Sequence, residues 1–230
     1  MRRAGSIWLV ATIVVSCFVG FVGLVCADSG RVLFKEDFSQ DAVGWFPMAQ
    51  FWTPNRGDVL DVFRVVSDPE MSPSNLLQIV SDSQGTEGYL LSPPIEVEGP
   101  RLQIAYSTKL ELKEGKVGET GFYLFPEGAA FPPHLTLFLS DQGVRSFGTV
   151  DGKLVGETVV EDLPADSFVD IVMTVDLEAG TVQYAVGGNG VERLFPLRRS
   201  GWGEVVHIAL FWRPGNTDAY YRYFEVRQLD

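Results

Sequence analysis

Aromatic residues are the part of this 230-residue sequence with the clearest potential for chemistry, since Phe, Trp and Tyr make up 12% of it. The apolar face of a sugar ring packs on a flat aromatic side chain, while nearby polar groups fix its hydroxyls. The residues that could together bind a saccharide are Trp45, Trp52, Tyr123, His207, Phe211, Arg213, Tyr223 and Glu225. Each aromatic residue could instead fill the hydrophobic core, but the whole set predicts at least one exposed platform.

Residues for catalysis are harder to assemble. Glycoside hydrolysis needs two carboxylates about 5–10 Å apart across the sugar. Glu96 and Glu98 share one strand face by their spacing, but Pro100 follows and no third acid is in register. His134 and His207 are isolated, and the sequence has no His-Glu-x-x-His or Gly-x-Ser-x-Gly motif. The sequence therefore favours binding over catalysis.

A structural Ca²⁺ is the one cofactor for which the sequence offers ligands. Ca²⁺ takes about six to eight oxygen ligands, often from aspartates and backbone carbonyls. Asp37, Asp58 and Asp61 could contribute carboxylates, although no EF-hand spacing occurs. We expect no other cofactor.

Alternation of apolar and polar residues predicts strands rather than helices. It is clearest over 101–108, 168–176 and 205–213. Turn signals at 151–152, 178–180 and 187–190 separate such runs, whereas 47–57 is the least strand-like stretch and predicts a long surface loop. About a dozen short strands over 28–230 predict a single all-β domain, a sandwich or a barrel.

The alternation also predicts which side chains point outward. If Phe224 faces the core, then Tyr223 and Glu225 face the other way. His207 and Phe211 share one face of an earlier strand. If these two faces are the same one, they form a mixed aromatic and charged patch suited to a saccharide.

Residues 1–27 differ sharply from the rest of the chain. Two arginines near the start precede an uncharged run over 7–25, and Val25-Cys26-Ala27 follows as a small-residue motif before Asp28. This order is typical of an export signal peptide. The run is also almost long enough to span a membrane, and 14–17 resembles a lipoprotein box. A cleaved signal peptide is the favoured interpretation, with a retained membrane anchor and lipidation as alternatives.

All three interpretations place residues 28–230 outside the cytoplasm, secreted or in the cell envelope. Cys17 and Cys26 both lie in the leader, so a mature chain would have no disulfide. The formal net charge is −12, and the 16 basic and 30 acidic residues left after cleavage give −14. Such an acidic chain is unsuited to nucleic acid or an anionic membrane surface, so membrane contact is expected only through the leader. The sequence does not specify an oligomeric state.

Three segments together resemble the concanavalin A-like lectin/glucanase superfamily, including its laminin-G-like members. They are Phe34-Lys35-Glu36-Asp37-Phe38-Ser39 with Gly44-Trp45, the strand pair over 168–186, and the closing strand over 219–227. The resemblance implies a jelly roll of two curved antiparallel sheets, with the closing strand paired beside the first. A carbohydrate-facing concave surface is common in that superfamily. Its glucanase members carry their catalytic acids as Glu-x-Asp-x-x-Glu, and this spacing is absent here.

We therefore predict an exported, non-catalytic, lectin-like β-sandwich whose partner is an oligosaccharide or polysaccharide. A structural or adhesive envelope protein that uses the same fold for protein contacts is the first alternative. A glycoside-active enzyme with a non-standard carboxylate pair is the second.

Overall fold

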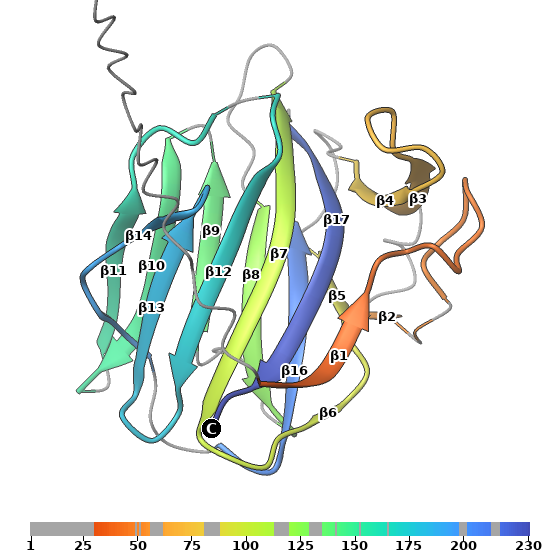
Figure 1. Ribbon diagram of the computed structural model, residues 1–230. Helices are drawn as coiled ribbons and strands as arrows, with labels where there is room; N and C mark the ends of the chain where they lie inside the picture. Colours follow the sequence, from red (N-terminus) through yellow and green to blue (C-terminus); the bar gives the residue numbers. More distant parts are fainter. Residues whose placement is uncertain are drawn as a thin grey trace, which may run out of the picture.

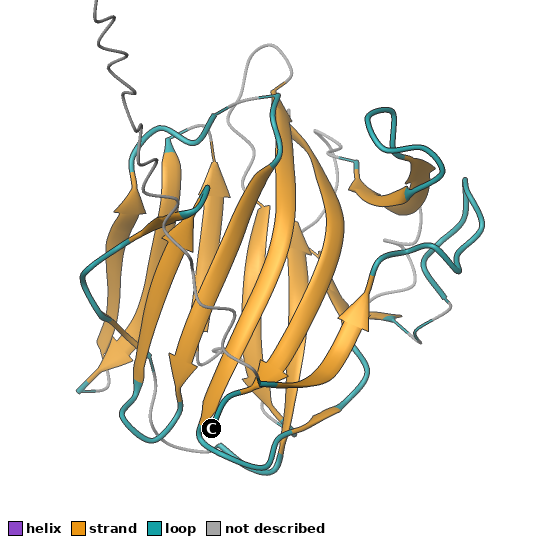
Figure 2. Ribbon diagram, in the orientation of Figure 1, coloured by secondary structure: helices purple, strands orange, loops and turns teal. Residues whose placement is uncertain are grey.

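The computed structural model consists of two antiparallel β-sheets packed face to face (Figures 1 and 2). It describes residues 30–48, 50, 52–55, 62–80, 88–112, 120–128, 135–140, 142–151, 153–164, 166–197, 202–212 and 217–230. The predicted two-sheet sandwich is confirmed. The leader and its two cysteines lie outside the described residues. Within those ranges we find no helix with the length and apolar character needed to cross a membrane.

One sheet has nine strands. They are β1 (Arg31–Glu36), β3 (Phe63–Ser67), β4 (Asn75–Ile79), β7 (Arg101–Leu112), β12 (Val169–Asp176), β13 (Thr181–Val186), β14 (Asn189–Gly190), β15 (Phe195–Pro196) and β17 (Thr217–Gln228). The order is β14-β13-β12-β7-β17-β4-β3, with β1 paired to β17 and β15 to β13. The closing strand thus pairs beside the first, with Lys35 opposite Glu225.

The other sheet has eight strands. They are β2 (Thr53–Pro54), β5 (Gly88–Leu91), β6 (Ile95–Glu96), β8 (Thr120–Pro126), β9 (Leu135–Ser140), β10 (Gly143–Val150), β11 (Lys153–Val160) and β16 (Val205–Trp212). The order is β11-β10-β9-β8-β16-β5-β2, with β6 paired to β16. Strands β2 and β3 are therefore edge strands of the two sheets.

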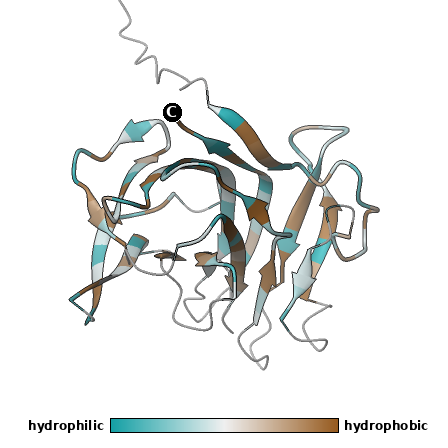
Figure 3. Ribbon diagram, turned by 90° about the horizontal axis from the view of Figure 1, so that it is seen from below, coloured by the Kyte–Doolittle hydropathy of each residue, from teal (hydrophilic) through white to brown (hydrophobic). Residues whose placement is uncertain are grey.

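The residue alternation explains the strands. The three most regular patterns form β7, β12 and β16, and hydrophobic and hydrophilic residues alternate along the strands in Figure 3. Asp151 and Gly180 adopt positive φ values of 49° and 69° in two of the predicted turns. The inward residues of both sheets form one continuous hydrophobic core. Tyr106 lies at its centre, stacked on Phe122 at 5.8 Å and on Phe224 at 5.3 Å between ring centroids.

The prediction of a surface loop over 47–57 is wrong in part. Residues 53–54 form β2, and Trp52 is only 4% exposed. Trp52 packs edge-on against Phe34 and Phe224, at 5.9 and 6.0 Å between centroids. The apolar surface of this indole outweighs the weak strand pattern of its neighbours.

Candidate functional site

A β-bulge in β17 creates the most distinctive feature of the outer face of the nine-stranded sheet. Tyr221 pairs with Thr108 and Tyr223 pairs with Ser107, so Arg222 is an extra residue in β17. A bulge of this kind re-aims a side chain and occurs often near functional sites. It places Arg222 and Tyr223, which are consecutive, on the same outer face, whereas Tyr221 and Phe224 remain buried.

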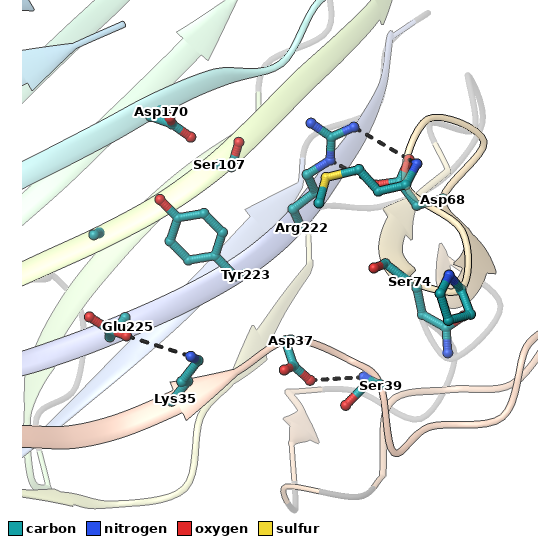
Figure 4. A pocket seen from close by; sticks show the side chains of 14 residues that line it. Lys35, Asp37, Ser39, Asp68, Ser74, Ser107, Asp170, Arg222, Tyr223 and Glu225 are labelled. Atoms are coloured by element: carbon teal, nitrogen blue, oxygen red, sulfur yellow. Dashed lines mark hydrogen bonds and ion pairs between the residues drawn. The ribbon is translucent and has the colours of Figure 1, made fainter. Parts of the chain in front are cut away.

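These two side chains line an open pocket with a volume of about 790 Å³ (Figure 4). Residues of β7, β12 and β17 form its floor, and the end of β1 and the β3–β4 connection form its walls. The lining residues are Lys35, Asp37, Ser39, Asp68, Met71, Pro73, Ser74, Asn75, Ala105, Ser107, Asp170, Arg222, Tyr223 and Glu225. Predominantly polar groups thus surround one aromatic ring.

Arg222 is held rigidly in the wall of this pocket. Its Nε donates to Asp68 Oδ2 at 2.7 Å, its Nη2 donates to Glu70 Oε2 at 2.5 Å, and its guanidinium lies 3.6 Å from the Phe168 ring centroid. Burial alone would raise the pKa of Asp68, but hydrogen bonds from Arg222 and the backbone outweigh it and lower that pKa. The same contacts raise the pKa of Arg222. The Arg222 charge is therefore compensated within the protein.

Tyr223 presents a ring and a free hydroxyl to the pocket. The side chain is half-buried, and Figure 4 shows its hydroxyl directed toward Asp170. Burial, and then the charges of Asp170 and Glu225, raise the pKa of Tyr223, so the phenol is protonated at neutral pH. Within the described part of the chain this hydroxyl has no hydrogen-bond partner. It can donate to a ligand and accept from one.

The pocket carries an excess of negative charge. Asp37, Asp68, Asp170 and Glu225 line it, against Lys35 and Arg222. Hydrogen bonds from Ser39 lower the pKa of Asp37, so its carboxylate is ionised at neutral pH. Glu225 accepts a hydrogen bond from Arg227 Nε and lies 3.9 Å from Lys35 Nζ. Of these four acids, Asp37 and Asp170 have no cation in contact among the described residues.

Two of the residues predicted to bind a carbohydrate lie in this pocket, Tyr223 and Glu225. The hypothesis that the outer faces of β16 and β17 coincide is wrong, because the two strands belong to different sheets. His207 and Phe211 therefore lie on the outer face of the eight-stranded sheet, away from Tyr223. The alternation of residues along a strand predicts which side chains point outward. It does not predict to which sheet the strand belongs.

The other predicted residues have separate surroundings. Tyr123 and Phe211 stack at 4.3 Å between centroids and are 6% and 2% exposed. His207 Nδ1 lies 3.1 Å from the Ser92 carbonyl oxygen. Trp52 is buried, and its indole Nε1 donates to Glu36 Oε2 at 3.1 Å. Trp45 is 72% exposed and lines a different cavity.

The calcium expectation stays a prediction. Asp37 lines the pocket, but Asp58, Asp61 and the predicted site residue Arg213 lie outside the described residues. In the described ranges, no group of three or more His, Cys, Asp or Glu side chains could hold a metal ion.

Arg222 and Asp170 are site residues that the sequence patterns did not identify. Strict alternation from Phe224 gives position 222 an inward side chain, so an arginine there conflicts with the core. That conflict is the signal from which the bulge could have been inferred. Asp170 is an exposed residue of the alternating strand β12, but nothing in the sequence around it links it to Tyr223.

No protein-family model and no curated protein sequence matches the chain. Solved structures do match it. One comes from work on endo-acting O-glycanases with which human gut microbiota initiate mucin breakdown (TM-score 0.63, 12% identity, 87% of this chain and 100% of that one). Another is a Bacteroides ovatus mixed-linkage glucan GH16 protein with a G4G4G3G product (TM-score 0.59, 13% identity, 84% and 99%). The fold is a concanavalin A-like jelly roll.

A third match is a structure named sialidase, with a TM-score of 0.50 and 11% identity over 74% of this chain. The chain spans only 17% of the length of that protein. Identities this low show a common fold, and activity depends on the site that each protein builds on it.

Proposed function

We propose that this chain binds a carbohydrate in the pocket around Tyr223. The observation that carries the proposal is the bulge of β17, which presents the Tyr223 ring in an open pocket of about 790 Å³. The hydroxyl of this ring has no hydrogen-bond partner among the described residues. A ring with polar groups around it matches a sugar, which has an apolar face and a rim of hydroxyls. The mucin O-glycanase and glucan GH16 names of the similar structures support the same ligand class.

The charges of the pocket favour a neutral saccharide. The positive charge of Arg222 is compensated by Asp68 and Glu70. Asp37 and Asp170 form no ion pair with any described residue. Carboxylates accept hydrogen bonds from sugar hydroxyls but repel the carboxylates or sulfates of an acidic glycan. We expect the Tyr223 pocket to discriminate against acidic glycans.

Affinity electrophoresis through gels that contain mixed-linkage glucan, neutral xylan or neutral mucin O-glycans would test this proposal. Tyr223→Ala should weaken the retention by at least about tenfold in Kd, equivalent to about 1.4 kcal/mol, because the stacking surface is lost. Tyr223→Phe keeps the ring and should retain most of the affinity. Gln183→Ala is the matched control, since Gln183 is exposed on the outer face of β13 and does not line the pocket.

Two results would overturn the proposal. One is a native chain that none of the neutral glycans retards. The other is a retained glycan whose affinity is the same for Tyr223→Ala and Gln183→Ala.

Cleavage of a glycoside is the second candidate function. Asp170 and Glu225 both line the pocket with Tyr223, so two carboxylates lie near the ring on which a sugar would stack (Figure 4). Paired carboxylates serve as acid and base or nucleophile in most glycosidases. Release of new reducing ends from a retained glycan, abolished by Asp170→Asn, would support this candidate. Binding without any release would exclude it for that glycan.

A further inference from the structure

A second cavity lies at the side of the sandwich and shares no lining residue with the Tyr223 pocket. Its volume is about 630 Å³. Residues of the edge strands β2 and β3 line it, together with the segment 44–48. That segment is anchored on β3, because the Gly44 amide donates to the Val65 carbonyl and the Val65 amide to the Trp45 carbonyl, both at 2.8 Å.

The floor of this cavity is rigid and aromatic. Trp52 and Phe63 are 4% and 0% exposed. The Trp52 indole is fixed by its hydrogen bond to Glu36, and Phe46 packs edge-on against Phe63 at 6.5 Å. A floor that is already packed loses little conformational freedom when a ligand binds.

The rim exposes large apolar side chains. Trp45 and Met48 are 72% and 71% exposed, yet both line the cavity. Apolar side chains gathered around an apolar hollow are typical of ligand sites, whereas single exposed ones are ordinary. A flat ring placed in the cavity would cover part of both side chains.

Arg64 gives this second cavity a positive charge. It is the one charged residue among the described residues that line this cavity. Its Nε donates to Gln78 Oε1 at 2.8 Å, and Gln78 is held in turn by Asp218 and Tyr220, so the guanidinium has a fixed direction. Neither Nη atom has a partner in the described part of the chain. Two free Nη groups form a fork that fits a carboxylate.

We propose that this cavity binds a carboxylate carried on a ring, with the ring between Trp45 and the aromatic floor and the carboxylate on the Nη groups of Arg64. The positive charge selects the ligand class, since no anion among the described residues contacts the Nη groups of Arg64. An aromatic acid and the uronate unit of a polysaccharide share this chemistry. The preference for an anion is opposite to that of the Tyr223 pocket, so the two sites can be tested separately.

Isothermal titration of the purified chain with 2-naphthoate, 2-naphthamide and digalacturonate would test the proposal. Naphthoate should bind more tightly than the isosteric, uncharged naphthamide. Arg64→Gln should weaken naphthoate at least tenfold and leave naphthamide unchanged. Trp45→Ala should weaken both, because it removes the ring surface. Arg145→Gln, at an exposed arginine on β10, and Tyr223→Ala should change neither.

Digalacturonate distinguishes the two sources of the carboxylate. Binding that depends on Arg64 assigns the site to uronates as well as aromatic acids, and absence of such binding restricts it to aromatic acids. Equal affinities for naphthoate and naphthamide, or equal naphthoate affinities of native chain and Arg64→Gln, would overturn the proposal. Neither result would affect the Tyr223-dependent binding of neutral glycans.

Discussion

Glu36 is an acid that the fold buries, with only 3% of its surface exposed. Its carboxylate accepts hydrogen bonds from the Phe38 amide at 2.6 Å and from Trp52 Nε1 at 3.1 Å. Burial raises the pKa of Glu36 above its ordinary 4.5, and Asp41 adds to the rise, although both hydrogen bonds oppose it. Through Trp52, this carboxyl group also fixes the floor of the second cavity.

The raised pKa predicts a specific pH dependence of stability. The folded chain holds the Glu36 proton more tightly than the unfolded chain, so the free energy of unfolding should fall as pH rises from 4.5 through the raised pKa. Asp37 and Asp68 have lowered pKa values, so they affect the free energy of unfolding only below pH 3.8. There the stabilisation of the folded chain by their carboxylates is lost as pH falls.

Glu36→Gln tests this dependence. The amide cannot ionise and offers one acceptor oxygen in place of two, so we expect a loss of about 1–3 kcal/mol and a flatter pH profile. Urea unfolding at several pH values between about 4.5 and 7.5 would measure both. If the free energy of unfolding of Glu36→Gln changes with pH as steeply as that of the native chain, Glu36 does not cause this pH dependence.

At the scale of elements, Arg222 ties β17 to the β3–β4 connection. Its partner Asp68 has a fully buried side chain, whereas the side chain of Arg222 is 19% exposed. Arg222→Leu leaves the Asp68 carboxylate without its cation, and we expect a loss of about 1–3 kcal/mol in the free energy of unfolding. Adding Asp68→Asn should recover part of the loss. A double variant as unstable as the sum of the single ones would contradict a direct interaction.

The outer face of the eight-stranded sheet depends on a close approach at Gly121. A Cβ at this position would lie 2.0 Å from the Leu137 carbonyl oxygen and 2.5 Å from the Phe211 ring. Gly121→Ala should therefore destabilise the chain by about 1–3 kcal/mol in urea unfolding. Gly190→Ala, where a Cβ would meet nothing within 4 Å, is the matched control. Equal stabilities of the two variants would show that the aromatic packing adapts.

Regular strands could be predicted from the sequence, because one buried face imposes alternation on β7, β12 and β16. The bulge could not be predicted by alternation alone, since Arg222 interrupts it. Sheet membership of β16 and β17 also escaped the sequence patterns, because pairing partners are distant along the chain. Tyr223 and Glu225 were therefore predicted correctly to face outward, while their neighbours in the site were not identified.

At the scale of the whole molecule, the site is a product of topology. Lys35, Asp68, Ser107, Asp170 and Tyr223 come from five parts of the chain, and pairing of β1, β7 and β12 around β17 brings most of them together. The pocket around Tyr223 is acidic, whereas Arg64 gives the second cavity a positive charge. One jelly roll can thus present two surfaces with opposite preferences for ligand charge.

Export is the whole-chain property on which access to external glycans depends. We expect the leader to be removed before Asp28, which N-terminal sequencing of protein from the producing cells would test. A full-length chain in the membrane fraction would instead support the retained anchor. A full-length chain in the cytoplasmic fraction would contradict export.

A crystal structure of the chain with a neutral oligosaccharide would locate the binding site. We expect a sugar ring stacked on Tyr223, with hydroxyls hydrogen-bonded to the Tyr223 hydroxyl and to Asp170. A sugar bound at another face, with the Tyr223 pocket left to solvent, would contradict this expectation.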